Sequence, residues 1–294
     1  MNRRLAFILN PRSGRQAGRP SKSEILKGLL SGSRETFHIL ETEYAGHATK
    51  LAAAAAADGI DIIVAYGGDG TVNEVACGIV GTTSSLGILP AGSGNGMARG
   101  LGIPTNFRKA LALIRHGRSR IIDAGSVNGS FFFNIFGMGF DAYLAGLFHQ
   151  KAGDVRGQLP YFTLGIRAYI SYQPVPVSVV IDGESIEISP LTLAVANGPQ
   201  YGSGARIAPE ADFSDGMLDL ISIDMLPVTH ALLAFPRLFT GSIAKVAERR
   251  RWKVKELKLG VPAGTLVHFD GEVRPGAEEM QIAVHPKALR VIAP

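Results

Sequence analysis

Residues 67–73 read GGDGTVN and follow the apolar run IDIIVAY. Glycines in a turn between a strand and a helix allow the backbone to approach a ligand closely, and the free N–H groups of the helix start favour phosphate. Asp69 does not suit a bare phosphate, because a carboxylate repels it. A magnesium ion between the two resolves the conflict, since Mg²⁺ takes carboxylate and phosphate oxygens together. We therefore interpret this turn as a magnesium-nucleotide site, with a simple connecting turn as the alternative.

Two further loops have the composition of phosphate-binding segments. NPRSG occupies Asn10–Gly14 at the end of the first expected strand, and LPAGSGNGMARGLGIP occupies Leu89–Pro104 after the fourth. Ligands of open α/β folds bind at the carboxyl ends of parallel strands, so these loops and the Gly67 turn are expected to meet. Arg12, Arg15 or Arg99 could neutralise phosphate, because the chain has no Walker lysine.

Acidic residues recur in the second half of the chain. HFDGEVRPG places Asp270 and Glu272 together, and PEADFSDGMLDL contains Asp212, Asp215 and Asp219. A positioned carboxylate can accept the proton of an alcohol, and two neighbouring acids raise one another's pKa. The alternatives are a plain Asp-Gly hairpin turn for the first segment and an acidic surface turn for the second, which lacks the EF-hand pattern.

The first part of the chain alternates apolar runs with helical patterns, which predicts a mostly parallel sheet covered by helices. Thr71 and Glu74 fit a capping box at the start of the helix that follows the glycine turn. The expected strands are residues 5–9, 36–40, 60–66 and 86–89, and the expected helices are 23–30, 48–59, 71–79 and 106–117.

After about residue 121 the pattern changes to strands joined by turns, which predicts an antiparallel β-sandwich. Asn128-Gly129 and Asp182-Gly183 are strong hairpin signals. Helical insertions are expected at 160–172 and 227–247. The expected strands include residues 191–197, 217–223, 252–259, 265–270 and 280–285. The domains predicted from this change are 1–124 and 125–294.

The composition excludes several classes of protein. With 46% hydrophobic and 19% charged residues the chain is globular, and its net charge of +5 suits anionic partners without a recognisable nucleic-acid module. No apolar stretch approaches the roughly 20 residues of a membrane-spanning helix. The single cysteine, Cys77, favours a reducing cytoplasm. The basic run ERRRWKVK, 248–255, is either a membrane contact or a solvated strand.

The ordered set NPRSG, ETEYAGHA, GGDGTVNEV, LPAGSGNGMARGLGIP and DGE resembles the bacterial diacylglycerol kinase family, and with it the catalytic domains of sphingosine and ceramide kinases. The resemblance implies an N-terminal α/β nucleotide domain and a C-terminal antiparallel β-sandwich, with the active site in the cleft between them. It implies phosphorylation of a lipid hydroxyl by ATP with Mg²⁺.

The same resemblance assigns individual residues. It implies that Glu272 is the general base with Asp270 beside it, and that Asp69 serves the metal-bound phosphates. A structural Mg²⁺ is implied, held by the carboxylate of Asp215 and by main-chain oxygens of Asp212 and Met217. Where family members usually have threonine, this chain has Ser93, which keeps the hydroxyl. The implied ATP contacts are Asn10, Pro11, Arg12, Ser13, Gly14, Thr42, Gly67, Gly68, Asp69, Gly70, Thr71, Val72, Asn73 and Ser93.

The expected partner is a lipid substrate at a membrane surface, without nucleic acid and without a transmembrane segment. The expected location is the cytoplasm, at the inner face of the membrane; a homodimer is left open. Two alternatives remain. An NAD kinase shares GGDGT and would phosphorylate a soluble dinucleotide, and a non-catalytic lipid-binding protein could keep the kinase fold.

Overall fold

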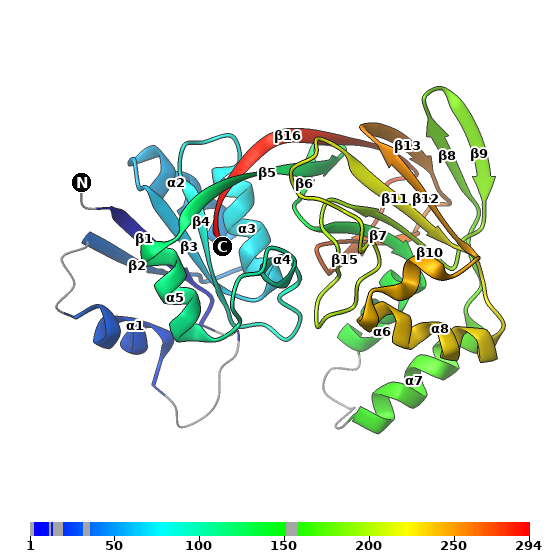
Figure 1. Cartoon of the computed structure of the whole chain (residues 1–294), viewed down its shortest axis with the longest axis horizontal. Coiled ribbons are helices and arrows are strands. Elements are labelled where there is room, and N and C mark those ends of the chain that lie inside the picture. Colours follow the sequence, from blue (N-terminus) through cyan, green and yellow to red (C-terminus); the bar gives the residue numbers. More distant parts are fainter. Residues whose placement is uncertain (1–2, 12, 14–19, 32–35, 151–157) are drawn as a thin grey trace. The chain divides into compact units, whose positions relative to one another are not determined.

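The structure is a computed structural model that describes residues 3–11, 13, 20–31, 36–150 and 158–294. The chain divides into two compact units, described separately below (Figure 1). The first unit is Met1–Ala124 with Pro286–Pro294, and the second is Gly125–His285. The predicted domain boundary after residue 124 stays a prediction. The return of the chain's last residues to the first unit is a feature that the sequence analysis did not foresee.

A parallel sheet forms the centre of the first unit. Its order is β2-β1-β3-β4, and every neighbouring pair is parallel. The strands are β1 (Arg4–Leu9), β2 (Thr36–Glu41), β3 (Ile62–Gly67) and β4 (Ser85–Pro90). All six residues of β3 are buried, as expected of a central strand with helices on both faces. The predicted α/β domain with its glycine turn is confirmed.

Helices follow the strands of this unit in the expected alternation. They are α1 (Lys22–Leu30), α2 (His47–Ala57), α3 (Asp69–Ile79), α4 (Gly96–Gly100) and α5 (Phe107–His116). The alanine run of α2 allows α3 to pack closely, because a Cβ on Gly78 would lie only 2.7 Å from the Cβ of Ala52. The short helix α4 was not predicted, since the sequence around it has the composition of a loop.

The second unit is a β-sandwich. One of its sheets has the order β12-β11-β10-β7-β14-β15 and is antiparallel throughout. In the facing layer β16 pairs with β13, β13 with β8 and β8 with β9, again antiparallel. The strands are β5 (Arg118–Val127), β6 (Ser130–Phe132), β7 (Ile135–Gly139), β8 (Val177–Ile181), β9 (Glu184–Ile188), β10 (Thr192–Ala196), β11 (Leu218–Ile223), β12 (Arg249–Val254), β13 (Glu256–Gly260), β14 (Leu266–Phe269), β15 (Glu272–Pro275) and β16 (Glu279–Ala293).

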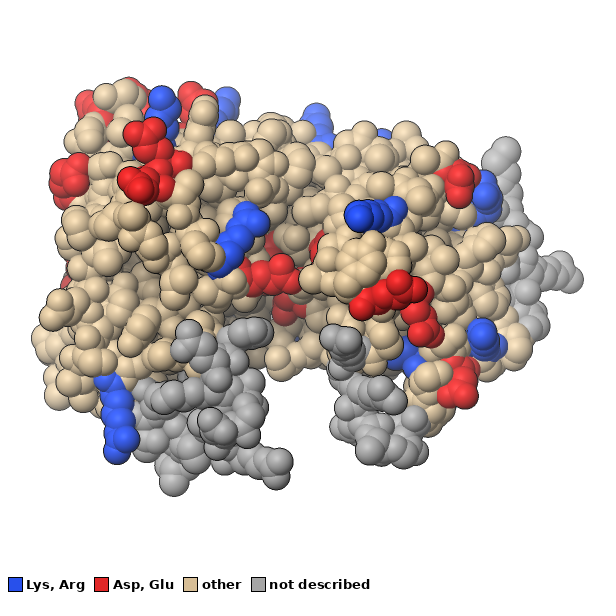
Figure 2. Space-filling view, turned by 180° about the vertical axis from the view of Figure 1, so that it is seen from behind, with Lys and Arg blue, Asp and Glu red and all other residues tan. Residues whose placement is uncertain are grey.

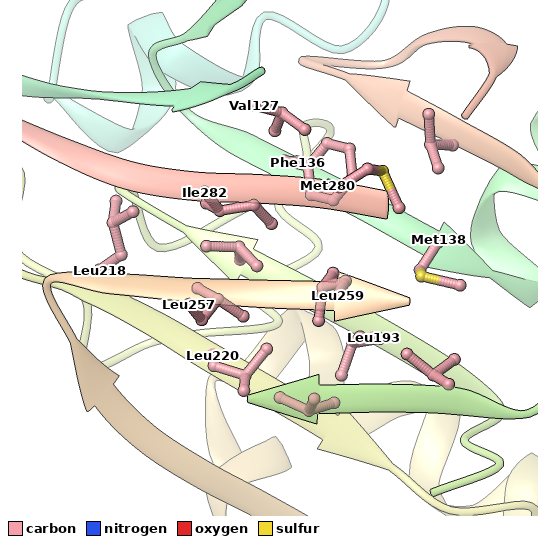
Figure 3. Packing of buried hydrophobic residues seen from close by; sticks show 14 of the residues in the cluster. Val127, Phe136, Met138, Leu193, Leu218, Leu220, Leu257, Leu259, Met280 and Ile282 are labelled. Atoms are coloured by element: carbon pink, nitrogen blue, oxygen red, sulfur yellow. The ribbon is translucent and has the colours of Figure 1, made fainter. Parts of the chain in front are cut away.

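Alternate residues of the two layers fill the core of the sandwich (Figure 3). Phe136 and Leu193 face inward from one sheet, and Leu257 and Ile282 face them from the other. Both predicted hairpins are present. Their turn residues have positive φ angles, 47° and 80° at Asn128-Gly129 and 51° and 85° at Asp182-Gly183. The predicted antiparallel sandwich is therefore confirmed.

In the described part of this unit the strands are interrupted by the α-helices α6 (Phe140–Gln150), α7 (Gln158–Ser171) and α8 (Val228–Thr240) and by the 3₁₀ helix η1 (Ser242–Lys245). Helices α8 and η1 fall within the predicted insertion 227–247, and α7 overlaps the insertion 160–172 but begins two residues earlier, whereas α6 was not predicted. Residues 252–259 were expected to form one strand, but the chain breaks at Lys255 between β12 and β13. Among the described residues, no helix has both the length and the hydropathy needed to cross a bilayer.

Candidate active site

Three of the predicted nucleotide segments lie at one edge of the parallel sheet. The N–H of Asn10 donates to the carbonyl of Tyr66 at 3.3 Å, and the N–H of Thr42 donates to the carbonyl of Leu9 at 2.8 Å. Ser13 donates through Oγ to the carbonyl of Ala91 at 3.4 Å, and Pro11 is exposed. The carboxyl ends of β1, β2, β3 and β4 therefore bring these loops together, as the parallel order requires. Arg12 and Gly14 lie outside the described residues.

The glycine turn and the GSGN loop are in direct backbone contact. A Cβ on Gly68 would lie 3.3 Å from the Cα of Gly92, and a Cβ on Gly92 would lie 2.7 Å from the Cα of Gly68. Asn95, with a φ of 50°, closes its own loop by bonding the N–H and the carbonyl of Gly92 at 3.0 and 2.7 Å. Glycines are needed here because the two loops leave no room for side chains.

Asp69 joins the same two loops. Its carboxylate accepts the N–H of Asn95 at 2.8 Å and that of Gly96 at 2.7 Å, and these are the groups at the start of α4. Such charge-assisted bonds at a helix start are stabilising. Asp69 therefore has a structural role that the sequence did not indicate, in addition to the role predicted at phosphate.

The helix after the glycine turn starts at Asp69, two residues earlier than expected. Gly68 is the N-cap and makes no side-chain cap bond, so the predicted capping box is wrong. Thr71 and Val72 are buried and face the unit's interior, which leaves them only backbone groups for a ligand. Glu74 instead accepts the N–H groups of Gly46 and Ala48 at the start of α2, at 2.9 and 3.0 Å.

The remaining predicted ATP contacts differ in exposure. Ser93 is exposed at the tip of its loop, while Gly67 is buried beneath the side chain of Thr71. Gly70 and Asn73 are half-buried on α3, and Asn73 accepts a weak bond from the Sγ of Cys77 at 3.5 Å. Ser93 therefore presents the most accessible hydroxyl of this group.

Lys22 is a cation at this edge that sequence reasoning missed. Its Nζ donates to the carbonyls of Asn10 and Tyr66 at 2.8 and 3.3 Å and lies 4.6 Å from the centre of the Tyr66 ring. Burial lowers the pKa of Lys22 from 10.5 to about 8. The sequence signal was weak, because a lysine in the first turn of an amphipathic helix is ordinarily solvated.

Asp270, predicted to act beside the general base, is tied to the backbone of the second unit. Its carboxylate accepts the N–H groups of Phe133, Asn134 and Ile135, each at 2.9 Å. With a φ of 50°, Asp270 also forms the turn between β14 and β15. Asp270 therefore positions the Asp-Gly-Glu turn, and its predicted role beside a general base stays a prediction. Glu272, the first residue of β15, is exposed.

A pocket of about 190 Å³ lies beside this turn, entirely within the second unit. Asp141 on α6 is at its polar side: its Oδ2 accepts the hydroxyl of Tyr201 at 2.7 Å and bonds Nε2 of His268 at 3.0 Å. Burial, and then Asp141, raise the pKa of Tyr201 well above its usual range, so that Tyr201 stays a donor. The pocket is lined by Asn134, Ile135, Asp141, Ala145, Tyr201, His268, Asp270 and Gly271.

The polar cluster at this pocket was also missed. His268 is only 3% exposed and pairs with Asp141. A Cβ on Gly137 would overlap Nε2 of His268 and lie 2.8 Å from Oδ2 of Asp141, so Gly137 provides the space for the pair. Asp141 precedes His268 by 127 positions, and nothing in the local sequence connects them.

In the loop that was predicted to bind a structural metal ion, the carboxylates of Asp212 and Asp215 are bonded to other groups of the protein. Asp212 accepts the N–H and the hydroxyl of Ser214 at 3.0 and 2.9 Å. Asp215 accepts the N–H of Met217 at 3.0 Å and pairs with the ammonium of Lys253. Among the described residues no group of three His, Cys, Asp or Glu side chains could hold a metal. A cation at Asp215 would lie beside the positive charge of Lys253.

The basic run 248–255 is largely neutralised. Arg249 pairs with Glu210, Arg250 with Asp224, Arg251 with Asp219 and Lys253 with Asp215. These pairs favour the interpretation of a solvated strand over that of a free basic patch. On the face drawn in Figure 2, basic and acidic side chains are interspersed, without an extended basic surface of the kind that nucleic acid requires.

The chain has an α/β unit with a glycine-rich turn, followed by a β-sandwich with an exposed carboxylate next to a pocket. This is the architecture expected of a two-domain lipid kinase. Residues 4–127 match the family model described as "Diacylglycerol kinase catalytic domain", and residues 134–293 match "YegS C-terminal NAD kinase beta sandwich-like domain". The chain belongs to the diacylglycerol kinase family and is a lipid kinase.

Individual relatives agree with this assignment. The chain is 31% identical to the diacylglycerol kinase of Bacillus subtilis over 273 residues, which cover 92% of this chain and 90% of that protein. It is 32% identical to the diacylglycerol kinase of Mycobacterium tuberculosis, with 99% and 95% covered. A solved diacylglycerol kinase from Bacillus anthracis matches with a TM-score of 0.74 over 100% of this chain and 97% of that one. At 23% identity the last comparison supports the fold alone.

Proposed function

We propose that the chain transfers the γ-phosphate of ATP, in the presence of Mg²⁺, to the hydroxyl of a diacylglycerol-like or sphingoid-like lipid. The observation that carries the proposal is that one lipid kinase chain has both clustered glycine-rich strand ends and an exposed Glu272 next to a pocket. The names of the curated relatives make diacylglycerol the first acceptor to test.

The nucleotide part of the proposal concerns the first unit. The backbone of Gly67–Asn73, the hydroxyl of Ser93 and the loop Asn10–Gly14 would surround the phosphates, with Thr42 at the adjacent strand end. Lys22 would add a positive charge there. Mg²⁺ would neutralise phosphate charge. A carboxylate has about four acceptor sites, so the two bonds of Asp69 to α4 do not by themselves prevent it from serving the metal-bound phosphates.

The acceptor part concerns the second unit. The lipid hydroxyl gives its proton to Glu272 while its oxygen forms a bond to the γ-phosphorus, and the bond from that phosphorus to the β-phosphate oxygen breaks to release ADP. Asp270 holds the turn that presents Glu272. Transfer requires that the carboxylate of Glu272 reach the γ-phosphate of the nucleotide.

Two finer assignments belong to the same proposal. The lipid acceptor implies peripheral contact with the inner face of the cytoplasmic membrane. A structural Mg²⁺ held by the carboxylate of Asp215 and main-chain oxygens of Asp212 and Met217 would lie beside the ammonium of Lys253. Loss of thermal stabilisation by Mg²⁺ in Asp215→Asn would support that site, and equal stabilisation of both proteins would contradict it.

The test is transfer of labelled γ-phosphate from ATP with Mg²⁺ to mixed micelles of diacylglycerol, monoacylglycerol, phosphatidylglycerol or a sphingoid base, and to NAD. We expect label on one lipid class, reduced by at least about 100-fold in Glu272→Gln because the proton acceptor is lost. Glu278→Gln is the matched control, since Glu278 is an exposed acid of the same unit.

The outcomes separate the alternatives. Label on NAD would make the acceptor a soluble dinucleotide. Binding of ATP without transfer to any acceptor would favour a non-catalytic lipid-binding protein. Full activity of Glu272→Gln would contradict the role of that residue and leave the kinase assignment standing.

A further inference from the structure

Helix α8 exposes an unusual amount of apolar surface. None of its residues is buried, although its sequence VTHALLAFPRLFT is mostly apolar. Leu233 is 73% exposed and Phe235 54%. Of the nine large hydrophobic side chains that are exposed among the described residues, five lie between positions 225 and 239: Met225, Leu232, Leu233, Phe235 and Phe239. A soluble surface helix ordinarily turns its apolar stripe inward, so α8 requires an explanation.

The helix has two apolar faces. Ala231, Ala234 and Leu238 pack against the core cluster of the second unit that includes Ile221 and Ile243. Val228, Leu232, Phe235 and Phe239 recur at i, i+4, i+7 and i+11 and form a second stripe, roughly 100° around the helix from the packed one. Leu232, Phe235 and Phe239 of this stripe are exposed. Phe235 and Phe239 meet edge to face at 5.4 Å. Figure 1 shows α8 at the surface of the second unit.

The charge around this stripe has one sign. Residues 225–247 contain no aspartate or glutamate. Arg237 near the end of α8 and Lys245 in η1 are exposed. Arg206, also exposed, lies beside the end of α8, because its N–H donates to the carbonyl of Leu238 at 2.8 Å. Among the described residues these three cations have no carboxylate partner, in contrast to the paired cations of the run 248–255.

We propose that α8 is the surface by which this kinase docks on an anionic bilayer. Leu232, Phe235 and Phe239 would insert at the boundary between lipid headgroups and acyl chains, and Arg206, Arg237 and Lys245 would contact the headgroups. An exposed apolar helix face flanked by cations and free of acids has the chemistry of an interfacial helix. A second copy docked α8 to α8 would bring the same cations against each other, which disfavours a dimer as the occupant. The inference rests on the proposed function, since the lipid acceptor resides in the membrane.

The experiment measures co-sedimentation of the full chain with vesicles of phosphatidylcholine alone and of phosphatidylcholine with phosphatidylglycerol. We expect binding to the anionic vesicles, weakened at least about tenfold in the double variant Phe235→Ser/Phe239→Ser. Arg237→Gln/Lys245→Gln should remove the preference for phosphatidylglycerol. Leu29→Ser, an exposed leucine of α1, and Arg250→Gln, a paired arginine, are the matched controls and should bind like the parent.

A second readout separates docking from catalysis. Activity on a short-chain, water-soluble diacylglycerol should be equal in the parent and in the α8 variants, whereas activity on vesicle-embedded diacylglycerol should fall. Unchanged sedimentation of the phenylalanine variant, or a dimer in the parent that this variant converts to a monomer, would overturn the proposal. Vesicle binding through α8 without transfer to any lipid would contradict the proposed function and leave the docking surface intact.

Discussion

The carboxylate of Asp69 has a structural role in the first unit and an expected role in nucleotide binding. It holds the N–H groups that start α4, and it lies in the turn expected at the nucleotide phosphates. The pattern GGDGT could indicate only the second, because the first depends on donors 26 and 27 positions away. A substitution at Asp69 therefore has to be judged on stability and activity together.

Asp69→Asn should reduce phosphoryl transfer by at least about 100-fold and also lower the melting temperature, since one charge-assisted bond, about 1.5–3 kcal/mol, is lost. Glu74→Gln is the matched control, because Glu74 also accepts two backbone N–H groups from a helix start. It should lower the melting temperature comparably and keep transfer. Kinetics at a temperature where both variants are folded provide the comparison. An active Asp69→Asn would restrict Asp69 to its structural role.

Lys22 should make nucleotide binding depend on pH. Because its pKa in the folded chain is about 8, Lys22 is mostly charged at neutral pH and mostly neutral above that value, so ATP affinity should fall as the pH rises through about 8. Stability should respond in the opposite direction. The unfolded chain binds more protons between pH about 8 and 10.5, so the contribution of Lys22 to the free energy of unfolding rises over that window.

Titration calorimetry of ATP binding from neutral to alkaline pH tests this. Lys22→Met should bind ATP weakly and lose the dependence, while Lys27→Met, which changes an exposed lysine of the same helix, should retain it. The same pH profile in Lys22→Met and the parent would exclude Lys22 as its source.

At the scale of elements, structures that depend on neighbouring residues could be predicted from the sequence, and structures that depend on residues of other elements could not. The hairpins at Asn128-Gly129 and Asp182-Gly183 depend on two residues each, and the sequence predicts both. Helix α4 depends on the carboxylate of Asp69, and the start of α2 on that of Glu74, which belong to other elements. The predicted capping box is wrong for the same reason. The carboxylate of Glu74 bonds the N–H groups at the start of α2 instead of those at the start of its own helix.

The pocket of the second unit illustrates this dependence on distant elements. The His268–Asp141 pair joins β14 to α6, and it fits only because β7 has a glycine at position 137. Gly137→Ala should push the two side chains apart, with a cost of about 1–3 kcal/mol for overpacking. The pair's loss would appear as a changed His268 ring signal in NMR and as a raised KM for the lipid.

Gly146→Ala on α6 is the matched control. Its new Cβ would meet nothing nearer than 3.5 Å, so this variant should fold at least as well as the parent and keep its KM. An unchanged His268 signal in Gly137→Ala would mean that neighbouring residues shift to accommodate the new Cβ and that the bond between His268 and Asp141 is kept.

At the scale of the molecule, β16 is shared between the units. Ile282 lies in the core of the sandwich, and Ile292 lies in the core of the parallel-sheet unit, where the neighbouring Val291 pairs with Leu86 of β4. The sequence showed an apolar strand near residues 280–285 and gave no sign that it continues into the other unit, because burial by a distant sheet leaves no local pattern. The first unit is therefore incomplete without the chain's last residues.

This arrangement predicts that one substitution has different effects at two positions of the same strand. Ile292→Ala and Ile282→Ala each remove a nearly fully buried side chain, and each should cost about 2–5 kcal/mol. Hydrogen exchange should accelerate in β1, β3 and β4 for Ile292→Ala, with weaker ATP binding, and in β8 and β13 for Ile282→Ala, with ATP binding retained. Because exchange reports the local free energy of opening, the two patterns distinguish separate units from a single cooperative block. Identical patterns in both variants would show that the units unfold together, with β16 transmitting the loss from either core to the other.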